Sequence, residues 1–352
     1  MIMPSALSSP FTNDGMMSIN ASHPKLKELL NPFRSEDSRF EHVSRYSYVD
    51  PSLIMDERII DFGCRYHVLV TKIKQGKEIA LNPNDSIDLR ISVRVGVIGW
   101  DAVKDTAIPS LQSAFGFENV NVLSMEKFNN NDKLEGIYNV EINVNTNKIP
   151  TGHSLDSCFE SLCNVRTLIL GSRLMDELKK ISNPTDNKTI ISRDHRQMFT
   201  IPIQRHSTFQ QSMVVTLTSD RVIIVIPVVV YYEPDRSLTR LFLQQFQQAQ
   251  QKSSAKNLPI CDFRRSNDPP LEIKSFKEKL YIDNDNLACY ISFTFLENQF
   301  QTTSDQINVT QNMLMFFDFL DYHVKCSKSF IHTRMRDTHD SLLKRLYSPK
   351  LS

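Results

Sequence analysis

Residues 306–347, QINVTQNMLMFFDFLDYHVKCSKSFIHTRMRDTHDSLLKRLY, decide the fold because they read as one unusually long amphipathic helix. No glycine or proline interrupts the run, and Ser348-Pro349 follows it as a stop signal. Thr303 and Gln306 have the spacing of a capping box at its start. At 1.5 Å per residue the helix would be roughly 60 Å long, whereas a domain of a hundred-odd residues is only about 35 Å across.

Apolar side chains return to one face of this helix at steps of three, four or seven residues, as 3.6 residues per turn requires. Since one domain could not cover so long a stripe, we expect a long helix of another chain to pack against it. We call this stripe the partner-helix seam. Its members are Val309, Met313, Phe316, Leu320, Val324, Ile331, Met335 and Leu342.

Basic residues border the seam. Between Asp321 and Tyr347 there are six Lys and Arg against three Asp, although the whole chain is nearly neutral, with 41 Lys and Arg and 40 Asp and Glu. This contrast favours a contact with an acidic protein surface. A solvated face with local salt bridges would have the same composition, so that interpretation stays open. The candidate contact residues are Lys325, Lys328, Arg334, Arg336 and Lys344.

Upstream of the helix, strand and helix signals follow one another in an order that occurs twice. The series consists of a group of strands, a short helix, a strand pair and a longer helix over 155–178. The same series begins again at residue 198. The clearest strand, 87–97, has six apolar positions at period two and a charged opposite face. Helices covering one face of an antiparallel sheet are typical of an α+β fold.

We therefore predict an α+β fold with two similar domains, each an antiparallel sheet with helices on one face, plus a long C-terminal α-helix. The predicted boundaries are 1–50 for a flexible N-terminal extension, 51–152 for the first α+β domain, 153–305 for the second, and 306–347 for the partner-binding helix. Within the extension, Leu26 to Leu30 is a short apolar piece that could form one helical turn.

No catalytic or cofactor motif is recognisable. The chain lacks the glycine-rich phosphate loops, the HExxH zinc motif and the GxSxG nucleophile motif, and it has only nine glycines. Its six cysteines show no paired spacing, so we expect buried thiols rather than metal ligands. Residues 193–196, the densest titratable cluster, are interpreted as a surface turn. We expect no enzyme, no cofactor and no metal site.

Charge and hydropathy exclude two further classes. A net charge of +1 and a pI of about 7.6 argue against nucleic-acid binding. No apolar run approaches eighteen residues, and residues 1–22 lack the pattern of a secretory signal, so we expect a cytosolic protein without a membrane span.

The stretch from Asp321 to Arg336, DYHVKCSKSFIHTRMR, resembles the C-terminal helix of the 34-kilodalton subunits (subunit 2) of the actin-related protein 2/3 complex. Three shorter matches follow that family's order: Asp220-Arg221-Val222, the LQQF of 243–246 and the PPLEIK of 269–274. The resemblance covers about 154–346 and, more loosely, 59–144. Nothing before that resembles the family.

This resemblance implies a structural scaffold subunit that supports actin filament nucleation and branching and contacts the mother filament. It implies two similar α+β domains and a long helix that packs antiparallel against a helix of the 20-kilodalton subunit. Other implied partners are the remaining subunits, including the actin-related proteins, in the cytoplasm at the actin cytoskeleton and cortical actin structures. Val324, Ile331 and Met335 would belong to the packed seam, and the five basic residues would face actin or neighbouring subunits.

Two other functions remain open on the residues alone. The chain could be a free-standing α+β adaptor or chaperone-like module that homodimerises through its C-terminal helix. It could also be an enzyme, in which case turnover would survive loss of residues 306–352. Expression of the chain by itself distinguishes the first from a scaffold subunit, because an exposed apolar stripe without its partner promotes aggregation.

Overall fold

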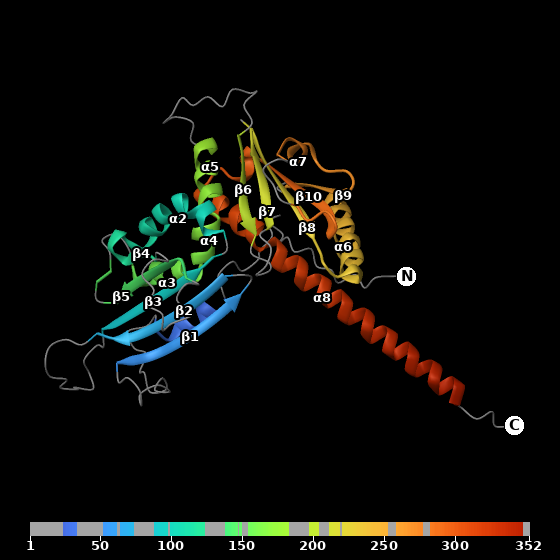
Figure 1. The fold of residues 1–352 in the computed structure, drawn as a ribbon, viewed down its shortest axis with the longest axis horizontal. Coiled ribbons are helices and arrows are strands. Elements are labelled where there is room, and N and C mark those ends of the chain that lie inside the picture. The colour runs from blue at the N-terminus through green and yellow to red at the C-terminus, as the bar shows by residue number, and fades with distance from the viewer. Residues whose placement is uncertain are drawn as a thin grey trace.

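The computed structural model contains two antiparallel sheets flanked by helices and one long helix that runs past both (Figure 1). It describes residues 24–33, 52–61, 64–73, 88–97, 99–123, 138–146, 148–149, 154–182, 197–203, 211–218, 220–252, 258–276 and 282–347.

The first sheet has five strands in the order β1-β2-β3-β5-β4. Each pair of neighbouring strands is antiparallel. Helix α2 connects β3 to β4, and Pro109 lies inside it. The bounds are β1 Leu53–Asp61, β2 Cys64–Lys72, β3 Leu89–Gly96, α2 Trp100–Phe115, η2 Phe117–Asn119, β4 Val120–Val122 and β5 Val140–Asn145.

The second sheet repeats this topology with the order β6-β7-β8-β10-β9. Helix α6 connects β8 to β9, which is the position of α2 in the first unit. The α+β prediction and the inferred repeat are therefore confirmed. The bounds are β6 Gln197–Ile203, β7 Gln211–Leu217, β8 Arg221–Val229, α6 Glu233–Lys252, β9 Ile260–Arg265, α7 Leu271–Phe276, β10 Leu287–Leu296 and η6 Glu297–Gln299.

The predicted helix over 155–178 is in fact three helices: α3 (Leu155–Cys163), α4 (Val165–Leu170) and α5 (Ser172–Ser182). All three pack against α2 of the first unit. The boundary between residues 152 and 153 stays a prediction, but this packing favours one after α5.

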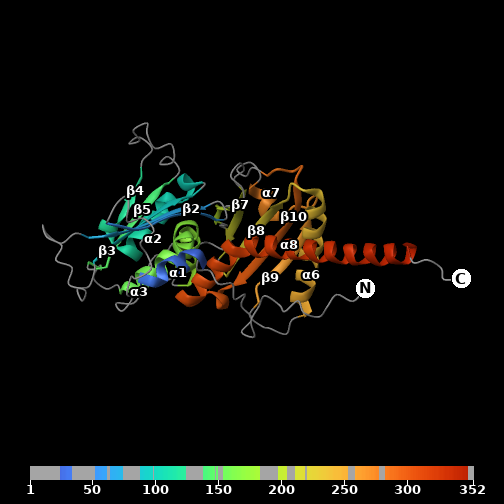
Figure 2. The same ribbon diagram turned by 90° about the horizontal axis from the view of Figure 1, so that it is seen from below.

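The N-terminal extension was predicted to be flexible, and this is wrong for residues 24–33. They form α1 (Pro24–Leu30) and the short helix η1 (Asn31–Phe33). Leu26, Leu30 and Phe33 are buried, because their apolar side chains join the core of the first unit. Helix α1 packs against α3 (Figure 2). The predicted helical turn at 26–30 is confirmed. Residues 1–23 and 34–50 lie outside the described part of the chain.

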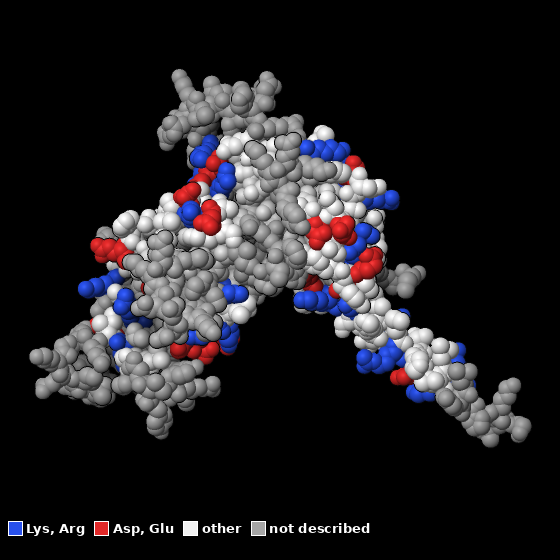
Figure 3. Space-filling view, in the orientation of Figure 1, with Lys and Arg blue, Asp and Glu red and all other residues white. Residues whose placement is uncertain are grey.

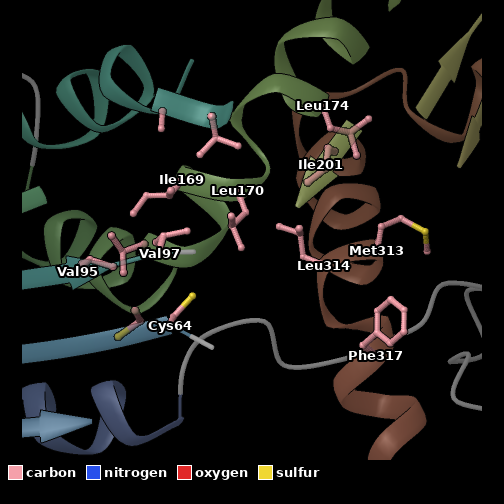
Figure 4. Packing of buried hydrophobic residues seen from close by; sticks show 14 of the residues in the cluster. Cys64, Val95, Val97, Ile169, Leu170, Leu174, Ile201, Met313, Leu314 and Phe317 are labelled. Atoms are coloured by element: carbon pink, nitrogen blue, oxygen red, sulfur yellow. The ribbon is translucent and has the colours of Figure 1, made fainter. Parts of the chain in front are cut away.

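One large core joins the two units, and α8 (Thr303–Tyr347) takes part in it. Figure 4 shows the junction, where Leu170 of α4 points toward Leu314 of α8. A second, smaller core lies between the opposite face of the second sheet and α7. The long helix begins at Thr303, three residues before the predicted 306, and its capping pair is Thr302 with Asp305 rather than Thr303 with Gln306. The Asp305 N–H donates to Thr302 Oγ1 at 3.1 Å, and the Thr302 N–H donates to Asp305 Oδ2 at 3.2 Å.

A candidate interaction surface on the C-terminal helix

Helix α8 is a single element of 45 residues, about 66 Å long. Its first half packs on α4, α5 and α6, and its second half projects away from both units (Figures 1 and 2). The break-free helix expected over 306–347 is therefore confirmed. Its two halves have different surroundings.

The first half of the partner-helix seam is buried within the chain itself. The expectation that these side chains face another polypeptide is corrected, because α4, α5 and α6 already exclude solvent from them. Since two α+β units together offer more surface than the single domain first considered, they cover about half of the helix. The corrected residues, all at most 6 % exposed, are Val309, Met313, Phe316, Leu320 and Val324.

Aromatic rings fill much of this packing. The Phe316 ring lies edge-on to Phe293 of β10, with centroids 5.1 Å apart, and 6.4 Å from Phe246 of α6. Farther along, the His323 ring stacks on Phe242 at 5.3 Å. Burial lowers the pKa of His323, so the neutral imidazole is favoured at this position.

Polar contacts fix the register of α8 against the rest of the chain. Asp318 accepts a 2.8 Å hydrogen bond from Arg166 of α4, and both side chains are nearly buried. Burial by itself would lower the pKa of Arg166, but the charge and hydrogen bond of Asp318 raise it overall, so the guanidinium is ionised. Near the start of the helix, Gln306 Nε2 donates to Ser182 Oγ and to the Phe300 carbonyl, each at 3.1 Å.

The second half of the seam is exposed. Ile331 is 42 % exposed, Met335 65 % and Leu342 52 %. At about 100° per residue these three side chains lie within about 40° of one another, and Val324 lies about 20° from Ile331 on the same face. The apolar stripe is thus continuous along the helix, although its cover ends soon after Val324. These three residues remain the predicted seam.

The candidate basic residues differ in their surroundings along α8. Lys325, Arg334, Arg336 and Lys344 are exposed on α8, and Figure 3 shows Lys and Arg along this projecting arm. Lys328 differs, because its Nζ lies 2.8 Å from Asp235 Oδ1 of α6 and 4.6 Å from the centre of the Tyr232 ring. It already serves a contact within the chain, and this weakens its candidacy for a partner contact.

Two exposed aromatic residues near the seam were missed from the sequence. Phe330 is 54 % exposed and lies 5.8 Å from the Arg334 guanidinium, and Tyr232 is 56 % exposed beside Lys328. Phe330 falls about 100° from Ile331, so it breaks the period by which the seam was found. Tyr232 lies in the turn before α6, where no periodicity exists to reveal it.

The cysteines differ in burial. Five of the six cysteines are buried as expected, but Cys326 is exposed on α8. Within the described ranges, no three His, Cys, Asp or Glu residues are grouped so as to hold a metal ion. No helix in the described part of the chain is long and apolar enough to cross a membrane. Residues 193–196 lie outside the described residues.

Comparisons with known proteins all find subunits of one kind. The model of a family described as "Arp2/3 complex, 34 kD subunit p34-Arc" matches residues 105–351, well over half of the chain. The chain is 31 % identical over 132 residues to "Actin-related protein 2/3 complex subunit 2" of Dictyostelium discoideum, across 37 % of this chain and 42 % of the relative. The Schizosaccharomyces pombe protein of the same name is 28 % identical over 131 residues, across 37 % and 40 %. The chain therefore matches about two fifths of the length of these relatives.

Proposed function

This chain belongs to the p34-Arc family of 34 kD Arp2/3 complex subunits, and from this premise we propose that it is a structural, non-enzymatic subunit of such a complex. Its role is to hold other subunits in place while the complex nucleates actin filaments and branches them from a mother filament. On this proposal it works in the cytoplasm, at the actin cytoskeleton and cortical actin structures.

One observation carries the proposal: the apolar face of α8 continues into a projecting arm on which Ile331, Met335 and Leu342 are exposed. Three large apolar side chains along one line cost free energy in water, at about 25 cal/mol per Å² of apolar surface. A helix laid along this line would cover all three. The proposed occupant is the long helix of the 20-kilodalton subunit, packed antiparallel.

The first experiment tests the arm as a docking surface. The full chain is co-expressed with the 20-kilodalton subunit, and Met335→Asp is compared with Thr333→Asp. Thr333 lies about 160° around the helix from Met335, so the control adds the same charge on the opposite face. We expect Met335→Asp to abolish co-purification, because a carboxylate in a dry helix contact costs several kcal/mol. The Thr333→Asp chain is expected to co-purify normally.

Two results would contradict the arm's assignment. Equal recovery of the partner with both variants would remove the exposed seam from the interface. A stable dimer of the chain by itself in sedimentation, with Met335→Asp turning it into a monomer, would instead support the homodimeric adaptor.

The second experiment tests the basic residues. Lys325 and Arg336 lie about 120° and 140° around the helix from Ile331, away from the seam, so reversing both to Glu should leave assembly intact. We expect weaker branching that depends less on salt, because a charge attraction with an acidic filament surface is lost. Branch density is counted by fluorescence microscopy at two salt concentrations. The control is Lys179→Glu, an exposed lysine on α5 outside the projecting arm.

A branch density equal to that of the unmodified complex would remove Lys325 and Arg336 from the proposed filament contact. Lys328→Glu is unsuitable for this test, because it also breaks the ion pair with Asp235.

A further inference from the structure

The outer face of the first sheet, turned away from its helices, carries a cluster of arginines. Strand alternation puts Ile91, Val93 and Val95 of β3 into the core, so Arg94 projects from the opposite face. In the strand register Arg94 lies opposite His67 of β2, and His67 lies opposite Arg58 of β1. Arg65, two residues before His67, shares this face. Arginines from three adjacent strands thus occupy neighbouring positions.

One phenol lies near this cluster. The ring of Tyr138, just before β5, lies 5.9 Å from the His67 ring between centroids. Burial raises the pKa of Tyr138 overall, although the nearby charges of Arg58, Arg65 and Arg94 each act to lower it. The nearby charge of Asp56 acts in the opposite direction to that of the three arginines.

The cluster has more positive charge than its own carboxylates balance. Arg94 Nε donates to Glu141 at 2.9 Å, and His67 Nε2 lies 2.8 Å from Asp56. Burial by itself would raise the pKa of Glu141, but hydrogen bonds from Arg94 and Ser92 lower it overall, so Glu141 is ionised and committed to Arg94. Arg58 and Arg65 make no ion pair with another described residue.

An exposed apolar residue stands beside the uncommitted arginines. Ile60 lies directly opposite Arg65 in the strand register and is 78 % exposed. Since β1 is at the edge of the sheet, Arg58 and Ile60 border open surface. A ligand that suits this pair of features has a negative charge next to an apolar group.

The second unit has the same fold without an arginine-rich outer face. Its sheet has the same topology, but the equivalent outer face is apolar: Val214, Val225 and Tyr290 are buried there under α7. A sheet of this kind can thus be closed by its own chain. In the first sheet the corresponding strands present arginines instead.

We propose that the outer face of the first sheet binds an acidic segment of a protein partner, with Arg58 and Arg65 receiving carboxylates and Ile60 contacting a neighbouring apolar side chain. A protein segment is favoured over a phosphate or a lipid headgroup, because a segment can bring separate carboxylates to Arg58 and Arg65 and an apolar side chain to Ile60, whereas a single phosphate group presents its charge at one point. This surface goes beyond the proposed function. Arg58, Arg65 and Arg94 precede residue 105, where the match to the family model begins.

The test uses the full chain, in whichever complex it is purified, and a fluorescein-labelled nine-residue peptide that alternates Glu with Leu. Binding is followed by fluorescence anisotropy. We expect Arg58→Glu with Arg65→Glu to weaken binding about tenfold or more, because two attractive charges become repulsive. Arg90→Glu is the matched control for each single reversal, Arg58→Glu or Arg65→Glu, because it makes the same change of charge: Arg90 is an exposed arginine on the same face, four residues from Arg94 along β3.

The possible results separate specific peptide binding from nonspecific charge attraction and from phosphate binding. Loss of binding in the double variant, with Arg90→Glu within twofold of the unmodified chain and no binding of a Gln-for-Glu peptide, supports the proposal. Equal losses in the single variants Arg58→Glu, Arg65→Glu and Arg90→Glu would show nonspecific charge attraction and overturn it. Arginine-dependent binding of inorganic phosphate without peptide binding would also overturn it, as would no binding at all. Thermal unfolding of each variant verifies that it is folded.

Discussion

Gly171 separates α4 from α5 and lies against Thr310 and Leu314 of α8. A Cβ at this position would lie 2.3 Å from Thr310 Cγ2 of α8 and 2.8 Å from the Thr167 carbonyl. The missing side chain therefore allows two helices to approach each other, and the backbone conformation is not the reason, since its φ is −91°. Close approach at this residue helps to bury the neighbouring Leu314.

Gly171→Ala should destabilise the chain by about 1–3 kcal/mol, because the added methyl group overpacks the contact with α8. The measurement is urea unfolding of the full chain. Adding Thr310→Ser removes Cγ2, the nearest obstructing atom, so the double variant should recover part of the loss. If Thr310→Ser brings no recovery, the contact with α8 is not the cause.

Helix α8 is a single element with two uses. Up to Val324 it belongs to the core of its own chain, and from Ser329 onward most of its side chains are exposed. The same apolar face serves both halves, because the period of the stripe does not change. The two halves differ in what packs against them. Helices α4, α5 and α6 pack against the first half, whereas no other described element packs along the far end of the second half.

Val324→Asp and Ile331→Asp test this division one seam position at a time. Val324→Asp puts a carboxylate into the core and should cost about 3 kcal/mol or more of folding stability. Ile331→Asp changes an exposed residue and should cost about 1 kcal/mol or less in the chain without partners. Thermal unfolding followed by circular dichroism compares them. Similar losses of melting temperature would mean that the intramolecular core extends farther along α8.

At the scale of the whole molecule, α8 joins two copies of one α+β unit. It follows β10 of the second unit but packs on α4 and α5, which themselves pack on α2 of the first. The Arg166–Asp318 ion pair crosses this junction, with side chains only 13 % and 10 % exposed. The projecting arm is therefore anchored to both units.

Arg166→Met should destabilise the chain by about 3–5 kcal/mol, because it leaves the Asp318 carboxylate buried without its main partner. Adding Asp318→Leu removes that charge, and the double variant should return close to native stability. Urea unfolding measures both. A double variant as unstable as the single one would show that lost packing, rather than an uncompensated charge, is responsible.

Local patterns in the sequence were enough to predict several features of the candidate site. The period of the stripe from Val309 to Leu342 predicted one uninterrupted helix, and the surplus of basic residues beyond Asp321 predicted a positive arm. The order of strands and helices predicted two related α+β units. Each of these is a property of neighbouring residues, so periodicity and stop signals report it directly.

Tertiary packing decided what covers each face. Periodicity shows that Val324 and Ile331 lie on one line, but only the placement of α6 and the two sheets makes the first buried and the second exposed. The break at Gly171 and the burial of Leu26 depend in the same way on partners far along the chain. A sequence determines which surfaces are apolar or charged, whereas the surface that meets them is a long-range property of the folded chain.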